Sequence, residues 1–201
     1  MIGRWRIVVA LVTSAGLALG GCDRLSSASK PVFNAIDITG AELGTDFRLT
    51  DHRGAPRSLG DFRGKAVVLF FGFTHCPDMC PTTLADLASA VRMLGPEGNR
   101  VQVLFVTVDP KRDTPELLER YVPAFHPDFL GLRGEPEETL RIARAFKIFV
   151  SEVPGRTPES YTIDHSTQKL AFDSRGQLRL LMAHGTPPEK IAADLRLLMN
   201  N

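Results

Sequence analysis

Two cysteines four positions apart, Cys76 and Cys80, are the residues of this sequence best suited to chemistry. They lie in the stretch FFGFTHCPDMCPTT, where an apolar run ends and His75 precedes the first cysteine. Side chains at i and i+4 share one face of a helical turn, about 5–6 Å apart at Cβ. Two thiolates so placed can close on one metal ion, or oxidise after a modest rearrangement. A position at the start of a helix also lowers the pKa of a thiol, so we expect reactive sulfur here.

Three roles are possible for the cysteine pair: a structural disulfide, a redox switch and a metal site. A disulfide that closes so short a loop stabilises little, which disfavours the structural disulfide. Structural zinc takes four ligands, and the sequence has three cysteines in all, so no second pair completes such a site. Copper(I) accepts sites with few soft sulfur and imidazole donors. If the pair holds a metal, copper with a histidine as third ligand is the favoured choice.

The segments around the cysteines alternate between buried strands and amphipathic helices. Continuous apolar runs predict strands at 65–73 and 101–110, the pattern of a parallel sheet covered on both faces. Leucine, alanine and valine at helical spacing predict a helix between them, with Pro81 in its first turn and Gly95 at its end. The same reasoning predicts a β-hairpin over 47–59, a helix begun by Thr114 and Pro115, a weaker strand at 129–134, a helix at 135–148, a β-hairpin of 169–173 and 178–183, and a C-terminal helix striped by Ile191, Leu195, Leu198 and Met199.

This order predicts an α/β fold: a thioredoxin-like mixed sheet flanked by helices, with an N-terminal β-hairpin extension. Cys76 and Cys80 follow the first buried strand, and Asp109 lies at the end of the second. Ligands of open α/β sheets bind outside the carboxyl ends of the strands. The cysteines therefore lie at the edge where this fold places its chemistry.

Five histidines could supply the third ligand. Turn, loop or strand-end positions predict a solvated or structural role for three of them: His52, His126 and His184. His75 is next to Cys76, and adjacent side chains of an extended chain point apart, so contact with the metal is disfavoured. His165 precedes the strand at 169–173, and in thioredoxin-like folds the loop before this strand faces the cysteines. We therefore expect His165 to complete the site.

The first 21 residues predict an export signal. Arg4 and Arg6 precede an apolar run over 7–19 and two glycines. The run is shorter than the ~20 residues of a membrane span. The sequence LGGC resembles the lipobox of bacterial lipoproteins, in which the cysteine, here Cys22, is lipidated. We expect a signal peptide at 1–21, the lipidated Cys22 with a flexible tether over 22–34, and a folded domain at 35–201, on the periplasmic face of the inner membrane. A signal peptide cut elsewhere, with an ordinary thiol at Cys22, is the alternative.

The charge balance excludes one class of partner. The chain has 24 Lys and Arg against 23 Asp and Glu, with a formal net charge of +1 and no basic block. Nucleic-acid binding needs a basic patch, and none stands out. We expect no nucleic-acid partner.

Three segments resemble the Sco/SenC family of copper chaperones for cytochrome c oxidase assembly. They are GKAVVLFFGFTHCPDMCPTTLADL, VTVDPKRDTPE and YTIDHS, and the likeness covers about residues 33–201. A CxxxC motif alone is weak evidence. The specific feature is CPDMCP after an apolar strand, with DPKRDTP and DHS at the right distances.

The resemblance implies a site and its partners. It implies ligation of a copper ion by Cys76, Cys80 and His165. It also implies delivery of copper to the CuA centre of cytochrome c oxidase subunit II, with a periplasmic copper donor and a thiol reductant as further partners. Three carboxylates match acidic positions of the family, with a role in supporting the site or contacting a partner, and loop capping as the alternative: Asp78, Asp109 and Asp113.

The cysteine pair is compatible with two functions, a metal carrier and a thiol–disulfide oxidoreductase. A metal carrier, which is no enzyme, would use a reversible Cys76–Cys80 disulfide to gate copper loading. A thiol–disulfide oxidoreductase would instead reduce the cysteines of the oxidase copper site. Reductases of the thioredoxin type use CxxC and a cis-proline before the following strand, whereas the spacing here is one residue longer and DHSTQK lacks proline. These departures favour the carrier. A peroxidase would need one activated cysteine in a different motif and is disfavoured.

Overall fold

The computed structural model describes residues 31–44, 46–157 and 160–200. The predicted signal peptide, Cys22 and the tether up to residue 30 lie outside these residues. No described helix has both the length and the apolar character that crossing a membrane requires.

Two buried parallel strands form the centre of the fold, β4 (Ala66–Gly72) and β5 (Val101–Thr107). Every residue of both strands is buried, as the continuous apolar runs predict. The sheet has the order β1-β10-β9-β4-β5-β6-β2-β3 and mixes parallel with antiparallel pairs. Its other strands are β1 (Ile36–Asp37), β2 (Leu49–Asp51), β3 (Pro56–Arg57), β6 (Leu130–Arg133), β9 (Lys169–Phe172) and β10 (Leu178–Met182).

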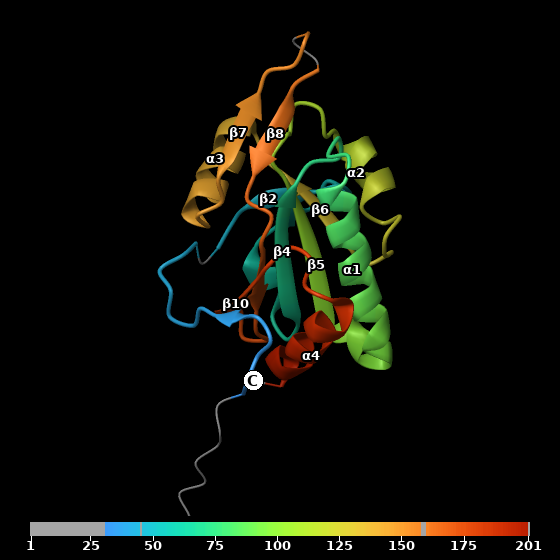
Figure 1. The fold of residues 1–201 in the computed structure, drawn as a ribbon, viewed down its shortest axis with the longest axis vertical. Coiled ribbons are helices and arrows are strands. Elements are labelled where there is room, and N and C mark those ends of the chain that lie inside the picture. The colour runs from blue at the N-terminus through green and yellow to red at the C-terminus, as the bar shows by residue number, and fades with distance from the viewer. Residues whose placement is uncertain (1–30, 45, 158–159, 201) are drawn as a thin grey trace, which may run out of the picture. The chain divides into compact units, whose positions relative to one another are not determined.

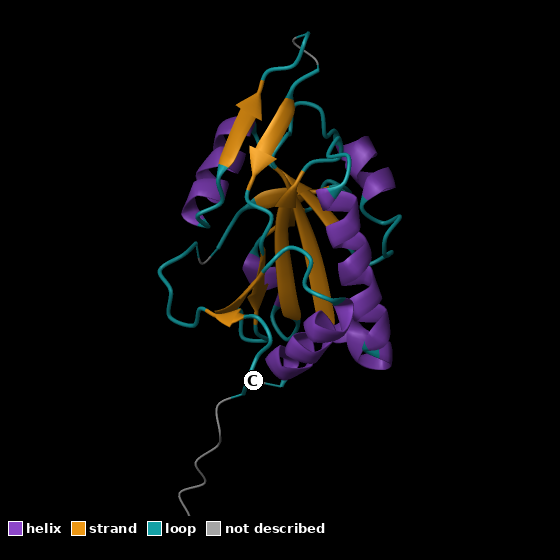
Figure 2. Cartoon of the chain, in the orientation of Figure 1, coloured by secondary structure: helices purple, strands orange, loops and turns teal. Residues whose placement is uncertain are grey.

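Helices cover both faces of this sheet (Figures 1 and 2). One apolar core lies against α1 (Met79–Met93), α2 (Pro115–Tyr121) and α4 (Pro188–Met199). The other core contains Ile142 of α3 (Pro136–Ala145) and Phe146, which directly follows this helix. The expected cap of α2 is present, since the Thr114 hydroxyl accepts from the Leu117 N–H. Two 3-10 turns connect elements, Leu59–Phe62 and Gly95–Arg100. The thioredoxin-like fold class is confirmed.

One element differs from the sequence-based expectation. The stretch before residue 161, where Pro154, Gly155 and Pro158 in the sequence predict a loop, contributes β7 (Val150–Val153), which pairs with β8 (Thr162–His165) in a separate antiparallel sheet. Prolines and a glycine between the two strands gave a loop pattern, whereas β-branched residues in both strands favour pairing. Figure 1 shows this pair above β4 and β5. His165 is the last residue of β8 and therefore lies at the end of a strand rather than in a loop.

Candidate metal centre

The two cysteines lie where β4 passes into α1. Cys76 is half-buried in the connecting loop, and Cys80 is fully buried in the first turn of the helix. Both are free thiols, and the Cys80 N–H donates to the Cys76 Sγ at 3.4 Å. The i, i+4 spacing thus brings the pair onto one helical turn, as expected from the sequence.

The expectation of a lowered thiol pKa is wrong for Cys80. Burial raises the pKa of this thiol, and a backbone contact with Phe73 only partly opposes the effect. A helix start favours the thiolate only within its first turn and at moderate strength, whereas removal from water disfavours the charged form strongly. Cys80 is therefore a thiol at neutral pH.

A glycine makes room for the buried sulfur. A Cβ added to Gly72 would lie 2.9 Å from Cys80 Sγ and 2.7 Å from a ring carbon of Phe105. Gly72 is the last residue of β4, and the other residues of this strand are all larger. A glycine in a strand often marks a place where another group approaches the backbone closely. Sequence reasoning missed this residue, although its place in the apolar run was the available signal.

His165 comes to the cysteines from a distant part of the chain. Its Nε2 lies 3.7 Å from Cys80 Sγ, and its Nδ1 lies 2.9 Å from the Ser166 carbonyl oxygen. Because a carbonyl only accepts, Nδ1 carries the proton and donates, and Nε2 presents its lone pair to the Cys80 S–H. Burial lowers the pKa of His165, so the ring is neutral at pH 7. The Phe73 ring meets it edge-on, with centroids 5.8 Å apart.

An open cavity of about 270 Å³ gives access to this site. Cys76 and His165 both line it, together with Phe73, Pro77 and Met79. Within the described ranges, no three His, Cys, Asp or Glu side chains are gathered closely enough to hold a metal ion. Cys80 and His165 are in contact, whereas the Cys76 sulfur is engaged by the Cys80 N–H. A sulfur that accepts an N–H hydrogen bond can also bind a metal, so this contact leaves Cys76 available as a ligand.

The other histidines have different surroundings. His75, whose side chain is half-exposed, lies 3.1 Å from the Thr74 hydroxyl, and His184 Nδ1 lies 3.2 Å from the Thr83 hydroxyl. His126 stacks on Phe129. The prediction of a solvated His52 is wrong: it is 4% exposed, and its Nδ1 accepts from the Gly131 N–H. The hairpin that carries His52 also pairs with β6, which covers the turn.

Asp113 fixes the loop that leads to Cys76. This fully buried carboxylate accepts from the Thr74 N–H at 3.1 Å, from the Thr74 hydroxyl and from the Thr107 hydroxyl at 2.6 Å. Burial raises the pKa of Asp113, and the hydrogen bonds from the two threonines oppose that rise. Asp113 thus ties the end of β5 to the residue two before Cys76. Exposed Asp78 stands at the N-cap of α1, where it accepts from the Thr82 hydroxyl.

Asp109 belongs to a cluster that fixes the start of β8. Its carboxylate accepts from the Arg112 guanidinium and from the Tyr161 hydroxyl, the latter at 2.7 Å. Arg112 also donates to the Tyr161 carbonyl at 2.8 Å and lies 3.6 Å over its ring. We call these three residues the Tyr161 clasp. It positions the strand that ends at His165, and its two unpredicted members lie inside the quoted segments DPKRDTP and YTIDHS.

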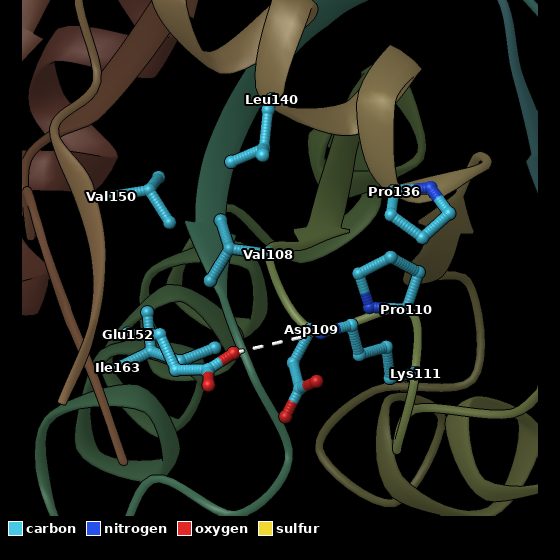
Figure 3. A pocket seen from close by; sticks show the side chains of 9 residues that line it. All are labelled: Val108, Asp109, Pro110, Lys111, Pro136, Leu140, Val150, Glu152 and Ile163. Atoms are coloured by element: carbon cyan, nitrogen blue, oxygen red, sulfur yellow. Dashed lines mark ion pairs between the residues drawn. The ribbon is translucent and has the colours of Figure 1, made fainter. Parts of the chain in front are cut away.

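A second pocket, of about 170 Å³, lies beside this clasp (Figure 3). Ile163 lines both it and the cavity of the cysteines. Its walls are mainly apolar, and Lys111 and Glu152 form an ion pair of 3.7 Å at its edge. The residues that line it include neither cysteine nor histidine, so this pocket lacks the soft ligands that line the other cavity.

Comparisons with known proteins identify the relatives of this chain. A model of the SCO1/SenC family matches residues 37–200. A SCO2-like protein of Rickettsia felis is 34% identical over 174 residues, which are 85% of this chain and 84% of the relative. The mitochondrial SCO2 homolog of Bos taurus is 48% identical over 60% of this chain. The chain spans about half the length of that relative, 46%.

Solved structures give the same result. ScoI of Bradyrhizobium japonicum with copper bound matches with a TM-score of 0.72 and 34% identity, over 79% of this chain and 99% of the other. Apo Sco1 of Thermus thermophilus matches with a TM-score of 0.74 and 41% identity, over 83% of this chain and 97% of the other. A SCO1/SenC family lipoprotein of Bacillus anthracis matches with a TM-score of 0.69 and 26% identity, over 83% of this chain and 99% of the other.

Proposed function

We propose, on the premise that this chain belongs to the SCO1/SenC family, that it is a membrane-tethered copper chaperone for the assembly of cytochrome c oxidase. One observation carries the proposal. Cys80 Sγ and His165 Nε2 lie 3.7 Å apart although 85 positions separate them, beside a cavity that Cys76 also lines. The relative from Bradyrhizobium japonicum, with copper bound, supports copper as the metal carried.

The proposed ligands are Cys76, Cys80 and His165. The neutral imidazole offers the Nε2 lone pair without first losing a proton. Cys80, a protonated thiol, must release its proton as copper binds. Two thiolates and one imidazole suit copper(I), which tolerates low coordination and soft donors. Asp113 and the Tyr161 clasp support the site by holding the two segments that carry the ligands.

Copper would reach and leave the site by ligand exchange. A periplasmic donor would hand over copper(I), and the chain would pass it to the CuA centre of oxidase subunit II. Exchange from sulfur to sulfur needs a site with few ligands and an open side, and the cavity supplies the open side. A thiol reductant would keep the two cysteines reduced, because a disulfide offers no thiolate ligand.

Copper stoichiometry tests the proposal directly. We expect the reduced full chain, purified in mild detergent, to bind one copper(I) and to pass it to apo subunit II. Copper bound per chain, measured by elemental analysis after gel filtration, gives the answer. The variants Cys76→Ser and Cys80→Ser serve as controls, and copper retained in full by both would place the metal elsewhere.

The anchor is proposed from the sequence and from a relative described as a lipoprotein. We expect Cys22 to carry lipid and to be the first residue of the mature chain, on the periplasmic face of the inner membrane. Mass spectrometry of the membrane-extracted protein checks both points. An unlipidated mature chain that begins at another residue would overturn this part of the proposal and leave the copper site untouched.

A further inference from the structure

Phe149 is a large apolar side chain beside the copper site that lies largely in the open. It is 63% exposed, and it lines the same cavity as Cys76 and His165. Single exposed apolar residues are common on protein surfaces and need no explanation by themselves. The place of this one, at the mouth through which a metal would leave, calls for an explanation.

The backbone of Phe149 is held against that of the histidine segment. Its N–H donates to the Ser166 hydroxyl at 2.9 Å, and its carbonyl accepts from the Ser166 N–H at 3.1 Å. The next residue, Val150, is the strand partner of His165. Both hydrogen bonds fix Phe149 relative to the ligand. With its backbone held, the Phe149 side chain has only two torsions to order when a partner covers it, and aromatic rings contribute strongly to interfaces.

The site has one open side, and this restricts how a partner can take the metal. Cys80 is fully buried beneath the cavity, whereas Cys76 and His165 face it. Metal–sulfur bonds are about 2.3 Å long, as for zinc, so an incoming thiolate has to enter the cavity itself. The protein that carries this thiolate then covers the residues around the cavity. Three of these residues are apolar: Phe149, Pro77 and Met79.

We propose that Phe149 is the docking anchor for the protein that accepts copper from this chain. The partner presents a loop with thiolate ligands, and an apolar residue beside those ligands packs on the Phe149 ring. This inference rests on the proposed function, because the occupant is identified by the ligands that line the cavity. Burial of the ring excludes water around the copper during exchange and orients the two ligand sets.

The experiment separates docking from copper binding by using two acceptors. The full chain in mild detergent is loaded with copper(I), and transfer is followed to apo oxidase subunit II and to the small chelator bathocuproine disulfonate. The chelator enters the cavity without a protein interface. The test variant is Phe149→Ala, and the matched control is Met93→Ala. Met93 is 54% exposed at the far end of α1, ~20 Å along the helix from Cys80.

With Phe149→Ala, we expect transfer to subunit II at sub-saturating concentration to slow at least tenfold, with copper stoichiometry and transfer to the chelator unchanged. Met93→Ala should match the parent chain with both acceptors. Unchanged transfer to subunit II, or equal slowing with both acceptors, would overturn the docking role. A parent chain that binds no copper would instead refute the proposed function, so the two failures are distinguishable.

Discussion

Replacing His165 with alanine is expected to weaken copper(I) binding by well over 100-fold. Changes in residues that only position a ligand cost about 10–100-fold, and the loss of a ligand from so sparse a set costs more. The reactivity of the thiols should largely survive, because both cysteines and the start of α1 that carries Cys80 remain in place. The affinity is measured by competition with bathocuproine disulfonate at fixed pH.

Two further variants serve as references for the loss of copper affinity in His165→Ala. His126→Ala removes a histidine that stacks on Phe129 and does not line the cavity, so copper affinity should stay at the parent value. Tyr161→Phe removes only the hydroxyl that donates to Asp109. Because the clasp positions β8 without touching the metal, its loss should weaken binding by at most about 10–100-fold. An affinity of His165→Ala no lower than that of Tyr161→Phe would show that His165 is no ligand.

The same variant separates the two functions in cells. If the chain carries copper, His165→Ala should lose oxidase activity, with partial rescue by added copper. If the chain only reduces thiols, the variant should support normal oxidase assembly, because both cysteines remain. The three residues between the cysteines and the lack of a proline in DHSTQK favour the carrier, because thioredoxin-type reductases use CxxC and a cis-proline.

The sequence predicts those parts of the molecule that depend on local pattern. Continuous apolar runs mark β4 and β5, and the Thr114–Pro115 pair marks the start of α2. The cysteines and His165 could be assigned to one edge because the order of elements fixes the topology. Residue types alone point to soft sulfur and imidazole donors, whereas the full ligand set is implied by the resemblance to the Sco/SenC family.

What the sequence misses depends on contacts between distant segments. The β7–β8 pair joins residues on either side of a proline-containing stretch, and the Tyr161 clasp joins two segments about 50 positions apart, so neither leaves a local pattern. His52 is buried by the pairing of its hairpin with β6. The raised pKa of Cys80 reflects how deeply the first turn of α1 is packed, which depends on Gly72 and on both neighbouring strands.

Oxidation of the cysteine pair is expected to abolish copper binding. Cys76 is the sulfur that lines the cavity, whereas Cys80 is fully buried, so an exogenous disulfide such as oxidised glutathione meets Cys76 first. The Cys76 thiolate displaces one glutathione thiolate and forms a mixed disulfide. Cys80 then attacks the Cys76 sulfur, passes its proton to solvent and releases the second glutathione. The chain loses two electrons and two protons to one oxidised glutathione.

The disulfide removes both sulfur ligands at once and leaves His165 alone, which cannot hold copper(I) against a chelator. We expect two reactive thiols and one copper per reduced chain, and neither in the oxidised chain, with full recovery on reduction. Cys76→Ser and Cys80→Ser should each retain a single thiol and show no intramolecular switch. Equal copper in the reduced and oxidised chains would contradict the assignment of both sulfurs. The Cys80 N–H already lies 3.4 Å from the Cys76 sulfur, so we expect the disulfide to form within this one turn of the chain.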